Sequence, residues 1–416
     1  MHLNGNKTLF SKCKILYISY DGILEPLGQS QVLAYLINLA PNHYFHLISF
    51  EKYGHKNDID REEFKRISED LTKHGIIWHP LRYHKNPTVL ATLWDIICGI
   101  LLGIWFVLRY RLTIVHARSY VPSVMAVVIK KLTGAKYIFD MRGFWADERV
   151  DGEMWPLGGR LYLIAKWFEK IFLLSADYVI SLTHAAVNEM ITFSYLHNRM
   201  PPFQVITTCA DLELFRPDMP DLLLYNKDSP FILGYVGNVR GWYLFDESLR
   251  CFKLLYESNN NVRMLIINQG EHKYIVDRLI ALNINIDRVD IKKASRNGVA
   301  KAMQKMDAGI FFIKPVYSKI ASAPTKLGEF LGCGVPCITN TGVGDMAQIL
   351  EKENVGVTIT NFDDLSLQIG INRLLQLINS DNINNRCRNT ALRYFSLEDG
   401  VKAYSQVYKK LDKLDN

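Results

Sequence analysis

Short apolar runs alternate with helical stretches twice along the chain, and this pattern most restricts its fold. The first series begins with Lys14–Ser19 and ends with Gln204–Thr208, and the second runs from Phe231–Gly237 to Val335–Asn340. Strands that are apolar throughout and separated by helices are typical of parallel sheets covered on both faces. The sequence therefore predicts two tandem doubly wound, Rossmann-like α/β domains, with ligands bound in the crevice between the carboxyl ends of their strands.

A proline-containing stretch between the two series divides the 416-residue chain into domains. Residues 210–230 contain three prolines and interrupt the alternation, so we expect a linker there. The N-terminal domain then covers 1–209 and the second domain covers 231–396. In 397–416, apolar side chains recur three and four positions apart, as in a helix with one apolar face. We expect this last helix to pack on the first domain.

Charge and cysteine content exclude several classes of protein. Lysine and arginine number 49 and aspartate and glutamate 42, and the net charge of +7 is small for this length. It excludes a histone-like protein but leaves room for a basic patch that faces phosphates or an anionic membrane. The seven cysteines form no C-x-x-C, and the first residues include no apolar signal segment. We expect reduced thiols, no nucleic-acid partner and a cytoplasmic location.

One stretch, Val89–Leu108, is apolar enough to concern a membrane. It is twenty residues long, which is sufficient to span a bilayer, and its only charge is Asp95. Spanning would place the strands near Lys14–Ser19 and Thr113–His116 on opposite sides of the membrane, where they cannot share a sheet. We therefore expect a helix buried against the sheet. The alternative is a helix that lies at a membrane interface.

The segment Ser322–Asp345 contains two predicted helix starts. At the first start, Ser322 precedes Ala-Pro, as is common at the beginning of a helix. Lys326 and Glu329 are three residues apart and share one face near this start. A helix N-terminus with a lysine favours a phosphate site, and Glu329 could accept hydrogen bonds from sugar hydroxyls. The alternative is an ion pair of the two residues on the surface.

Two glycine-containing loops follow predicted strands of the second domain. In Thr341-Gly-Val-Gly-Asp, Gly344 and Asp345 begin a helix, so that backbone N–H groups could approach a pyrophosphate. In Gly237-Asn238-Val-Arg240, the glycine leaves room for a ligand and the guanidinium could bind a diphosphate. The alternatives are a simple glycine turn and a solvated arginine.

Polar residues of the first domain also follow its predicted strands. Gly28 and Gln29 lie between the first strand and a helix. His116 and Arg118 end the strand in TIVHAR and face the crevice, and a dense polar cluster follows the next strand, in DMRGFWADE. The D-x-D pair Asp58 and Asp60 lies in a polar stretch, where Asp60 as a helix cap is the favoured interpretation, so we expect no metal site. The candidates in DMRGFWADE are Arg142, Asp147 and Glu148.

Together these segments resemble the family 4 glycosyltransferases of the GT-B fold, over nearly the whole chain. In the first domain the resemblance rests on YISYDGILEPLGQSQVLAYL, IVHARS and DMRGFWADE. In the second it rests on YVGNVRGWY, SAPTKLGEFLGCGVPCI and GVGD. The resemblance implies a first domain that binds the acceptor, a second domain that binds a nucleotide sugar, and a last helix that crosses back.

The resemblance also implies roles for residues of the second domain. Arg240 and Lys326 would hold the donor diphosphate, and Glu329 matches the second Glu of the family's E-x7-E motif, which binds the nucleotide ribose. The first Glu, which contacts the donor sugar, is replaced here by Ala321. The other donor-side candidates are Gly237, Asn238, Ser322, Gly344 and Asp345.

In the first domain, Arg142 lies where many members of the family have a His near the donor sugar, and Gly28 lies in the loop that approaches the donor phosphates. The acceptor-side candidates are Gln29, His116, Arg118, Asp147 and Glu148.

The activity implied is metal-independent transfer of a sugar from a UDP- or GDP-sugar, with retention, to a glycan or a polyprenyl-diphosphate-linked acceptor. Bacterial O-antigen, capsule or exopolysaccharide synthesis fits the apolar stretch, with peripheral contact at the inner membrane surface and no cofactor besides the donor. Two alternatives stay open: a nucleotide-sugar epimerase, and a non-catalytic GT-B-like module that binds or scaffolds a polysaccharide complex.

Overall fold

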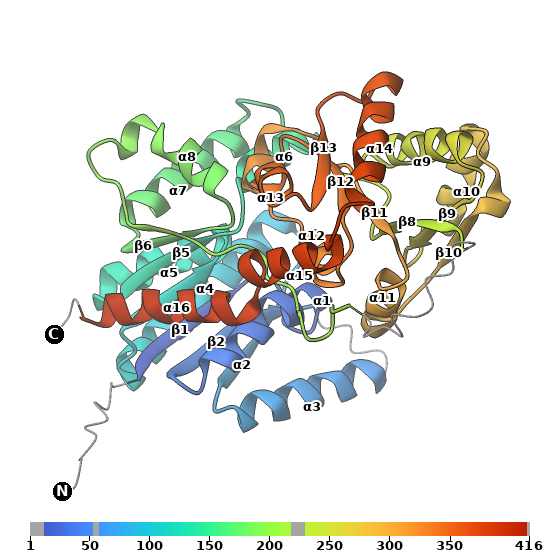
Figure 1. Cartoon of the computed structure of the whole chain (residues 1–416). Helices are drawn as coiled ribbons and strands as arrows, with labels where there is room; N and C mark the ends of the chain where they lie inside the picture. The colour runs from blue at the N-terminus through green and yellow to red at the C-terminus, as the bar shows by residue number, and fades with distance from the viewer. Residues whose placement is uncertain (1–11, 53–57, 218–228, 414–416) are drawn as a thin grey trace, which may run out of the picture.

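The computed structural model describes residues 12–52, 58–217 and 229–413 and contains two parallel β-sheets (Figure 1). We call the part of the chain that carries the seven-stranded sheet the first half, and the part that carries the six-stranded sheet the second half. In the first sheet the strand order is β3-β2-β1-β4-β5-β6-β7. Its strands are β1 (Cys13–Ser19), β2 (His43–Glu51), β3 (Ile77–Arg82), β4 (Ile114–Arg118), β5 (Lys136–Met141), β6 (Tyr178–Ser181) and β7 (Phe203–Val205).

Helices cover both faces of the first sheet, as its apolar strands require. One core cluster joins this sheet to α4, α5 and α7, and a second cluster joins its other face to α2, α3 and the last helix. These helices are α1 (Pro26–Gly28), α2 (Ala34–Leu39), α3 (Asp58–Lys73), α4 (Thr88–Tyr110), α5 (Tyr120–Thr133), α6 (Trp145–Asp151), α7 (Arg160–Ser175) and α8 (His184–Ile191). Because α3 begins at Asp58, Asp60 lies inside the helix and is not its cap.

The second sheet has the order β10-β9-β8-β11-β12-β13 and surrounds a single large core cluster. The sequence analysis missed its last strand, which follows the GVGD loop and α13. The strands are β8 (Phe231–Val236), β9 (Val262–Ile267), β10 (Val289–Lys292), β11 (Ala308–Ile310), β12 (Cys337–Asn340) and β13 (Gly356–Ile359). The helices are α9 (Phe245–Ser258), α10 (His272–Ala281), α11 (Arg296–Met303), α12 (Thr325–Gly332), α13 (Met346–Lys352), α14 (Asp364–Ile378) and α15 (Ile383–Tyr394).

Helix α4 contains the apolar stretch, and the expectation that it is buried against the sheet holds for one face only. Gly99 and Gly103 lie on the packed face, where an added Cβ would come within 2.4 Å of Met125 Sδ and 2.5 Å of Ile129 Cδ1 on α5. Asp95 is also buried there, and accepts hydrogen bonds from Tyr20 and His84. Only 28% of the most apolar stretch of α4 is buried, so much of the apolar surface of this helix faces outward.

The last helix, α16 (Leu397–Asp412), returns to the first half as expected (Figure 1). It contacts α2, β1 and β4, and its apolar face belongs to the core cluster on that side of the first sheet. The chain leaves the first half next to the place where it re-enters, because the Ala210 amide donates to the Phe395 carbonyl oxygen at 2.9 Å. Of the expected linker, 218–228 lies outside the described residues.

Candidate functional site

The most unusual side chain in the second half is Lys326, the second residue of α12. It is 8% exposed, and its Nζ atom is shielded from solvent without a hydrogen-bond partner among the described residues. Aromatic rings surround the ammonium group, and the ring centre of Tyr243 lies 3.9 Å away. Burial lowers the pKa of Lys326 from 10.5 to about 7, and the Glu329 charge only partly offsets this effect.

Gly237, at the end of β8, forms the wall opposite Lys326. Its φ of +110° is strained for other residues, and a Cβ there would lie 2.9 Å from Lys326 Nζ. Two hydrogen bonds hold the loop that begins at Gly237: Asn268 Nδ2 donates to the Gly237 carbonyl oxygen, and the Tyr235 hydroxyl donates to the Asn238 carbonyl oxygen. The glycine expected to make room for a ligand thus faces a buried cation.

Glu329 and Arg240 lie around this cation in different ways. Glu329 is partly buried, which raises its pKa against the opposing charges of Arg296 and Lys326. No ion pair joins it to Lys326 in the described part of the chain, so the surface pair that the spacing also allowed is not formed. Arg240 is exposed, stacks 4.0 Å from the ring centre of Tyr274 and lies 3.5 Å from Glu271. Its guanidinium is therefore oriented but still accessible.

The first half contributes a buried charge cluster at the carboxyl ends of β4 and β5. Asp140 accepts a hydrogen bond from Tyr404 of α16 and lies 3.4 Å from His116 Nε2, 3.6 Å from Arg142 and 4.0 Å from Arg118. Burial alone would raise the pKa of Asp140, but the Arg142 charge and the His116 hydrogen bond hold it well below its usual range. The two arginines therefore exceed the one carboxylate, which leaves a positive charge at this edge of the first sheet.

The two halves meet where α6 contacts the 3₁₀ turn Tyr317–Ala321. Gly143 lies against Ala321, since an added Cβ would be 3.8 Å from the Ala321 carbonyl oxygen. Arg142 is thus placed next to the position where spacing assigns the first Glu of E-x7-E. Ala321 is buried among core side chains of the first half and offers no polar group there.

Two family models match the chain, one in each half. The model described as glycosyl transferase 4-like domain matches residues 66–200, and the model for group 1 glycosyl transferases matches residues 224–393. The chain is a GT-B glycosyltransferase of the family 4 type.

Solved structures support the same fold for the glycosyltransferase. A glycosyltransferase from Rickettsia africae matches with a TM-score of 0.69 and 15% identity, over 97% of this chain and 100% of that chain. The Anabaena protein HepE, in complex with UDP and glucose, matches with a TM-score of 0.66 and 13% identity, over 95% of this chain and 99% of that chain. The lipopolysaccharide outer core galactosyltransferase WaaB matches with a TM-score of 0.63 and 13% identity, over 95% of this chain and 99% of that chain. No curated protein sequence matched the chain.

Several predicted donor-side residues of the glycosyltransferase serve another purpose. The Asp345 carboxylate accepts hydrogen bonds from the His184 and Ala185 amides, at 2.7 and 2.9 Å, and so caps α8 of the first half. The Gly344 amide donates to the Lys319 carbonyl oxygen, so it is not free for a pyrophosphate. The expected site at this loop is therefore corrected, because these groups join the two halves.

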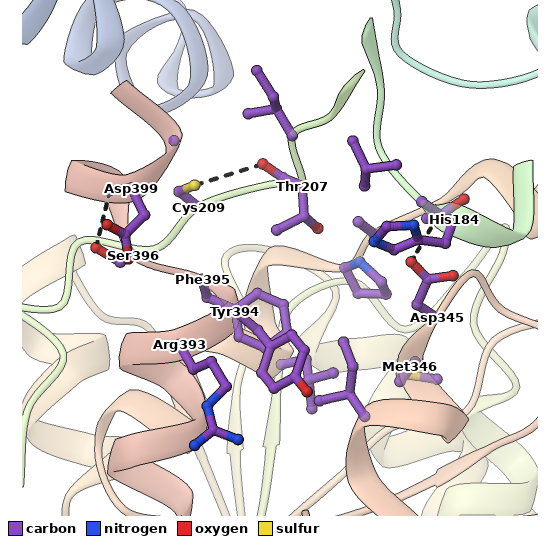
Figure 2. Close-up of a pocket in the computed structure, with 18 of the residues that line it drawn as sticks. His184, Thr207, Cys209, Asp345, Met346, Arg393, Tyr394, Phe395, Ser396 and Asp399 are labelled. Atoms are coloured by element: carbon purple, nitrogen blue, oxygen red, sulfur yellow. Dashed lines mark hydrogen bonds between the residues drawn. The ribbon is translucent and has the colours of Figure 1, made fainter. Parts of the chain in front are cut away.

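Ser322 also departs from its expected place. Helix α12 begins at Thr325, and its N-cap residue is Pro324, whose ring has no atom that could accept a capping hydrogen bond. Ser322 lies before this position and does not cap the helix. Ser322 and Asp345 line a cavity of about 340 Å³ beside the chain crossings, where His184 and Tyr394 project (Figure 2). Lys326 is not among the described residues that line it. The cavity at the crossings is thus separate from the buried cation.

The acceptor-side candidates are also divided. Glu148 Oε1 lies 2.7 Å from Lys319 Nζ, so this carboxylate ties α6 to the second half. Asp147 accepts hydrogen bonds from Tyr162 and Lys166 within the first half. His116 and Arg118, expected at the crevice, are buried instead in the cluster around Asp140, where burial lowers the pKa of His116.

The loop after β1 folds tightly on itself. An added Cβ at Gly28 would lie 2.1 Å from the Gly22 carbonyl oxygen, so this glycine is required by the loop itself. Gln29 Nε2 donates to the Leu24 carbonyl oxygen and to Glu63. The amides of Ile23 and Leu24 donate to the carboxylate of the buried Glu51. The structure thus explains Gly28 by packing, and its approach to donor phosphates stays a prediction.

Sequence reasoning missed the aromatic residues that enclose Lys326 and the tyrosines that hold Asp140. Tyr243 stands three positions after Arg240 in YVGNVRGWY, so the aromatic pair next to this basic loop was the available signal. Tyr404 and Tyr408 stand on the apolar face of the last helix, where their spacing indicated packing but not hydrogen bonds to the first half.

Proposed function

We propose that this glycosyltransferase moves a sugar from a UDP- or GDP-sugar to a lipid-linked glycan in bacterial surface polysaccharide synthesis, with retention of the donor's anomeric configuration. The observation that carries the proposal is the buried Lys326 ammonium group, which lacks a partner and faces Gly237. Such a charge is costly in the free protein, and a diphosphate would supply the missing counter-charge. The similar Anabaena protein, solved with UDP and glucose, supports this type of ligand.

In the proposed mechanism, side chains neutralise the diphosphate as it leaves the sugar. Lys326 and the first amides of α12 contact it from one side, and Arg240 binds it with its guanidinium plane. Charges that are in place before the reaction stabilise the leaving group without reorganisation, which is commonly a large contribution. Glu329 accepts hydrogen bonds from the ribose hydroxyls. The mechanism assigns no step to a metal ion or cofactor.

The replacement of the first motif Glu by Ala321 shifts the handling of the donor sugar to the first half. Arg142 directly precedes Gly143, which lies against Ala321, and the Arg142 guanidinium lies 3.6 Å from Asp140. We assign Arg142 to the donor sugar and its leaving oxygen. We infer retention from the resemblance to family 4 enzymes alone.

An exposed apolar face on α4 and α7 supports an acceptor with a lipid anchor. We call this surface the lipid-facing surface; on α4 it shows an almost continuous line of exposed side chains. Arg109, Arg111 and Lys131 are exposed at the ends of α4 and α5, where they would meet anionic headgroups. We therefore assign the enzyme to the inner face of the cell membrane as a peripheral protein. The surface comprises Val89, Leu90, Leu93, Trp94, Ile97, Leu101, Trp105, Leu108, Leu161, Leu163, Ile164 and Trp167.

The test of the proposal is thermal unfolding with UDP, with GDP and without nucleotide. Ligand at about a hundred times its dissociation constant adds roughly 2.7 kcal/mol, which shifts the midpoint by several degrees. We expect a shift with one nucleotide in the wild type and in the exposed-lysine control Lys301→Ala, and none in Lys326→Ala.

Incubation of the same variants with the matching nucleotide sugar and a membrane lipid extract then measures transfer. Lys326→Ala should abolish it without loss of the fold. The absence of any nucleotide shift in the wild type would contradict the proposal. A changed donor sugar without acceptor would indicate an epimerase.

A further inference from the structure

A second cavity lies between α6, α7 and the segment that follows α8 in the first half and the 3₁₀ turn Tyr317–Ala321 of the second half. Its volume is about 450 Å³, within the range of small-molecule sites. Four aromatic side chains line it, and we call it the aromatic pocket. They are Tyr162, Phe193, Tyr195 and Tyr317.

The charge in the aromatic pocket is unfavourable for an anion. Asp147 and Asp151 line it together with one cation, Lys166. Lys166 Nζ lies 3.0 Å from Asp147 and also pairs with the buried Glu169, so carboxylates already neutralise it. A phosphate group would meet uncompensated negative charge here, in contrast to the surroundings of Lys326. A neutral ligand with hydroxyl groups would not be repelled.

Hydrogen-bonding groups and ring faces occur together in this pocket. Asp147 and Asp151 each accept bonds within the protein and keep further lone pairs for hydroxyl donors. The Tyr195 hydroxyl has no hydrogen-bond partner in the part of the chain that the structure describes. The C–H face of a pyranose packs on such rings while its hydroxyls bind the carboxylates.

The aromatic pocket lies near Arg142 on one side and opens to the protein surface on the other. Phe144 stacks on Tyr317 at 5.4 Å between ring centres, and Gly143, its neighbour, lies against Ala321. Asp147 is five positions after Arg142, so their Cα atoms are at most about 18 Å apart. On the other side, Leu157 both lines the pocket and is exposed.

Helix α7 relates the pocket to the lipid-facing surface. It carries Tyr162 and Lys166 into the pocket, while its neighbouring side chains Leu161 and Ile164 point outward as part of the lipid-facing surface. A saccharide attached to a membrane lipid would therefore find the pocket beside the bilayer and within reach of Arg142.

We propose that the aromatic pocket is the acceptor subsite and binds a neutral saccharide unit of the lipid-linked glycan. The proposal rests on the proposed function, but it concerns a separate cavity. Asp147 and Tyr195 bind the sugar hydroxyls, and Tyr162 and Tyr317 contact its faces.

Saturation-transfer NMR tests the pocket with the methyl glycosides of glucose, galactose, mannose and N-acetylglucosamine, and with glucose 6-phosphate as the anionic probe. At least one neutral glycoside should bind the wild type, and glucose 6-phosphate, tested with the nucleotide site saturated by UDP or GDP, should not. Val150→Trp fills the pocket and should remove the signal, while Tyr195→Ala should weaken binding by roughly tenfold. The control Tyr44→Ala removes an exposed tyrosine on β2 and should bind like the wild type.

The lack of a signal with every neutral glycoside, or its persistence in Val150→Trp, would overturn the proposal. If Val150→Trp does not fold, Tyr195→Ala decides, since unchanged binding there overturns the proposal too. The nucleotide-induced shift in unfolding temperature should persist in both variants. If nucleotide does not shift the unfolding temperature of the wild type, only the proposed donor site is contradicted. The failure of the donor site and the failure of the aromatic pocket can therefore be told apart.

Discussion

Replacing Lys326 by methionine keeps the length of the side chain and removes its charge. In the free protein the pKa of this lysine is about 7 instead of 10.5, because burial penalises the ammonium group. The difference of about 3.5 pK units corresponds to a cost on the order of 5 kcal/mol when the group is protonated. Lys326→Met should therefore unfold at higher denaturant concentration than the wild type at pH 6.

The sign of the pH dependence follows from proton linkage. Below pH 7 the folded and unfolded states both carry the proton, so the wild type bears the full cost. As the pH rises from 7 towards 10.5, the folded state has lost the proton that the unfolded state still binds, and the stability of the wild type rises. The advantage of Lys326→Met should shrink over this range. The exposed-lysine control Lys301→Met should show no such trend.

Binding of a nucleoside diphosphate should restore the proton to Lys326. At pH 8 a pKa of about 7 leaves roughly one molecule in eleven protonated, whereas a pKa near 10.5 leaves almost all protonated, so binding should take up about 0.9 proton. The terminal phosphate of the nucleotide is already ionised at this pH. Calorimetry in buffers with different ionisation enthalpies measures this uptake directly. A binding enthalpy independent of the buffer would refute the reasoning, and Lys326→Met should show neither uptake nor tight binding.

Four further predictions address other parts of the structure. Tyr404→Phe removes the hydroxyl bound to Asp140, so turnover should fall while the nucleotide KM stays constant; Val407→Ala, a packing control, should lower stability only. Burial, with Lys409 and Lys12, lowers the pKa of His43 from 6.5 to about 4, so stability from this neutral ring is lost as the pH falls through that window. His43→Phe should resist this loss by up to about 3 kcal/mol in urea unfolding at pH 4. Leu101→Glu with Trp105→Glu should weaken flotation with vesicles that contain phosphatidylglycerol, unlike Leu365→Glu on α14. Asp345→Asn should lower the unfolding free energy by about 1 kcal/mol through the weaker α8 cap, with unchanged nucleotide binding.

The sequence was sufficient to predict the strands with long apolar runs and the return of the last helix to the first half. It failed at Gly356–Ile359, because the segment GVTI begins with a glycine and contains a polar threonine and so offers no continuous apolar run. It also failed for α4, since hydropathy counts apolar residues but does not show which face has a neighbour. The small residues Gly99 and Gly103 carried that information, because they mark the contact with α5.

The sequence indicates candidate site residues but not their contacts. Spacing alone placed Lys326 near Glu329, and only the fold showed that the ammonium group faces Gly237, 89 positions earlier in the chain. Asp345 has the position expected for a ligand-binding loop, yet its partners are amides of α8, which belongs to the other half. A local pattern cannot distinguish a ligand from a distant backbone group, because both present the same donors.

The crossings at Ala210 and Phe395 make the second half an insertion within the first. During synthesis, the second half can complete its own core while the first still lacks a helix. Tyr404, Tyr408 and Leu411 leave the ribosome after the whole second half, and they close the apolar cluster beside β1 and β4. The earliest part of the chain is thus the last to finish folding. A stop codon just before α16 would leave both sheets complete but the core of the first half open, a form that chaperones would have to bind.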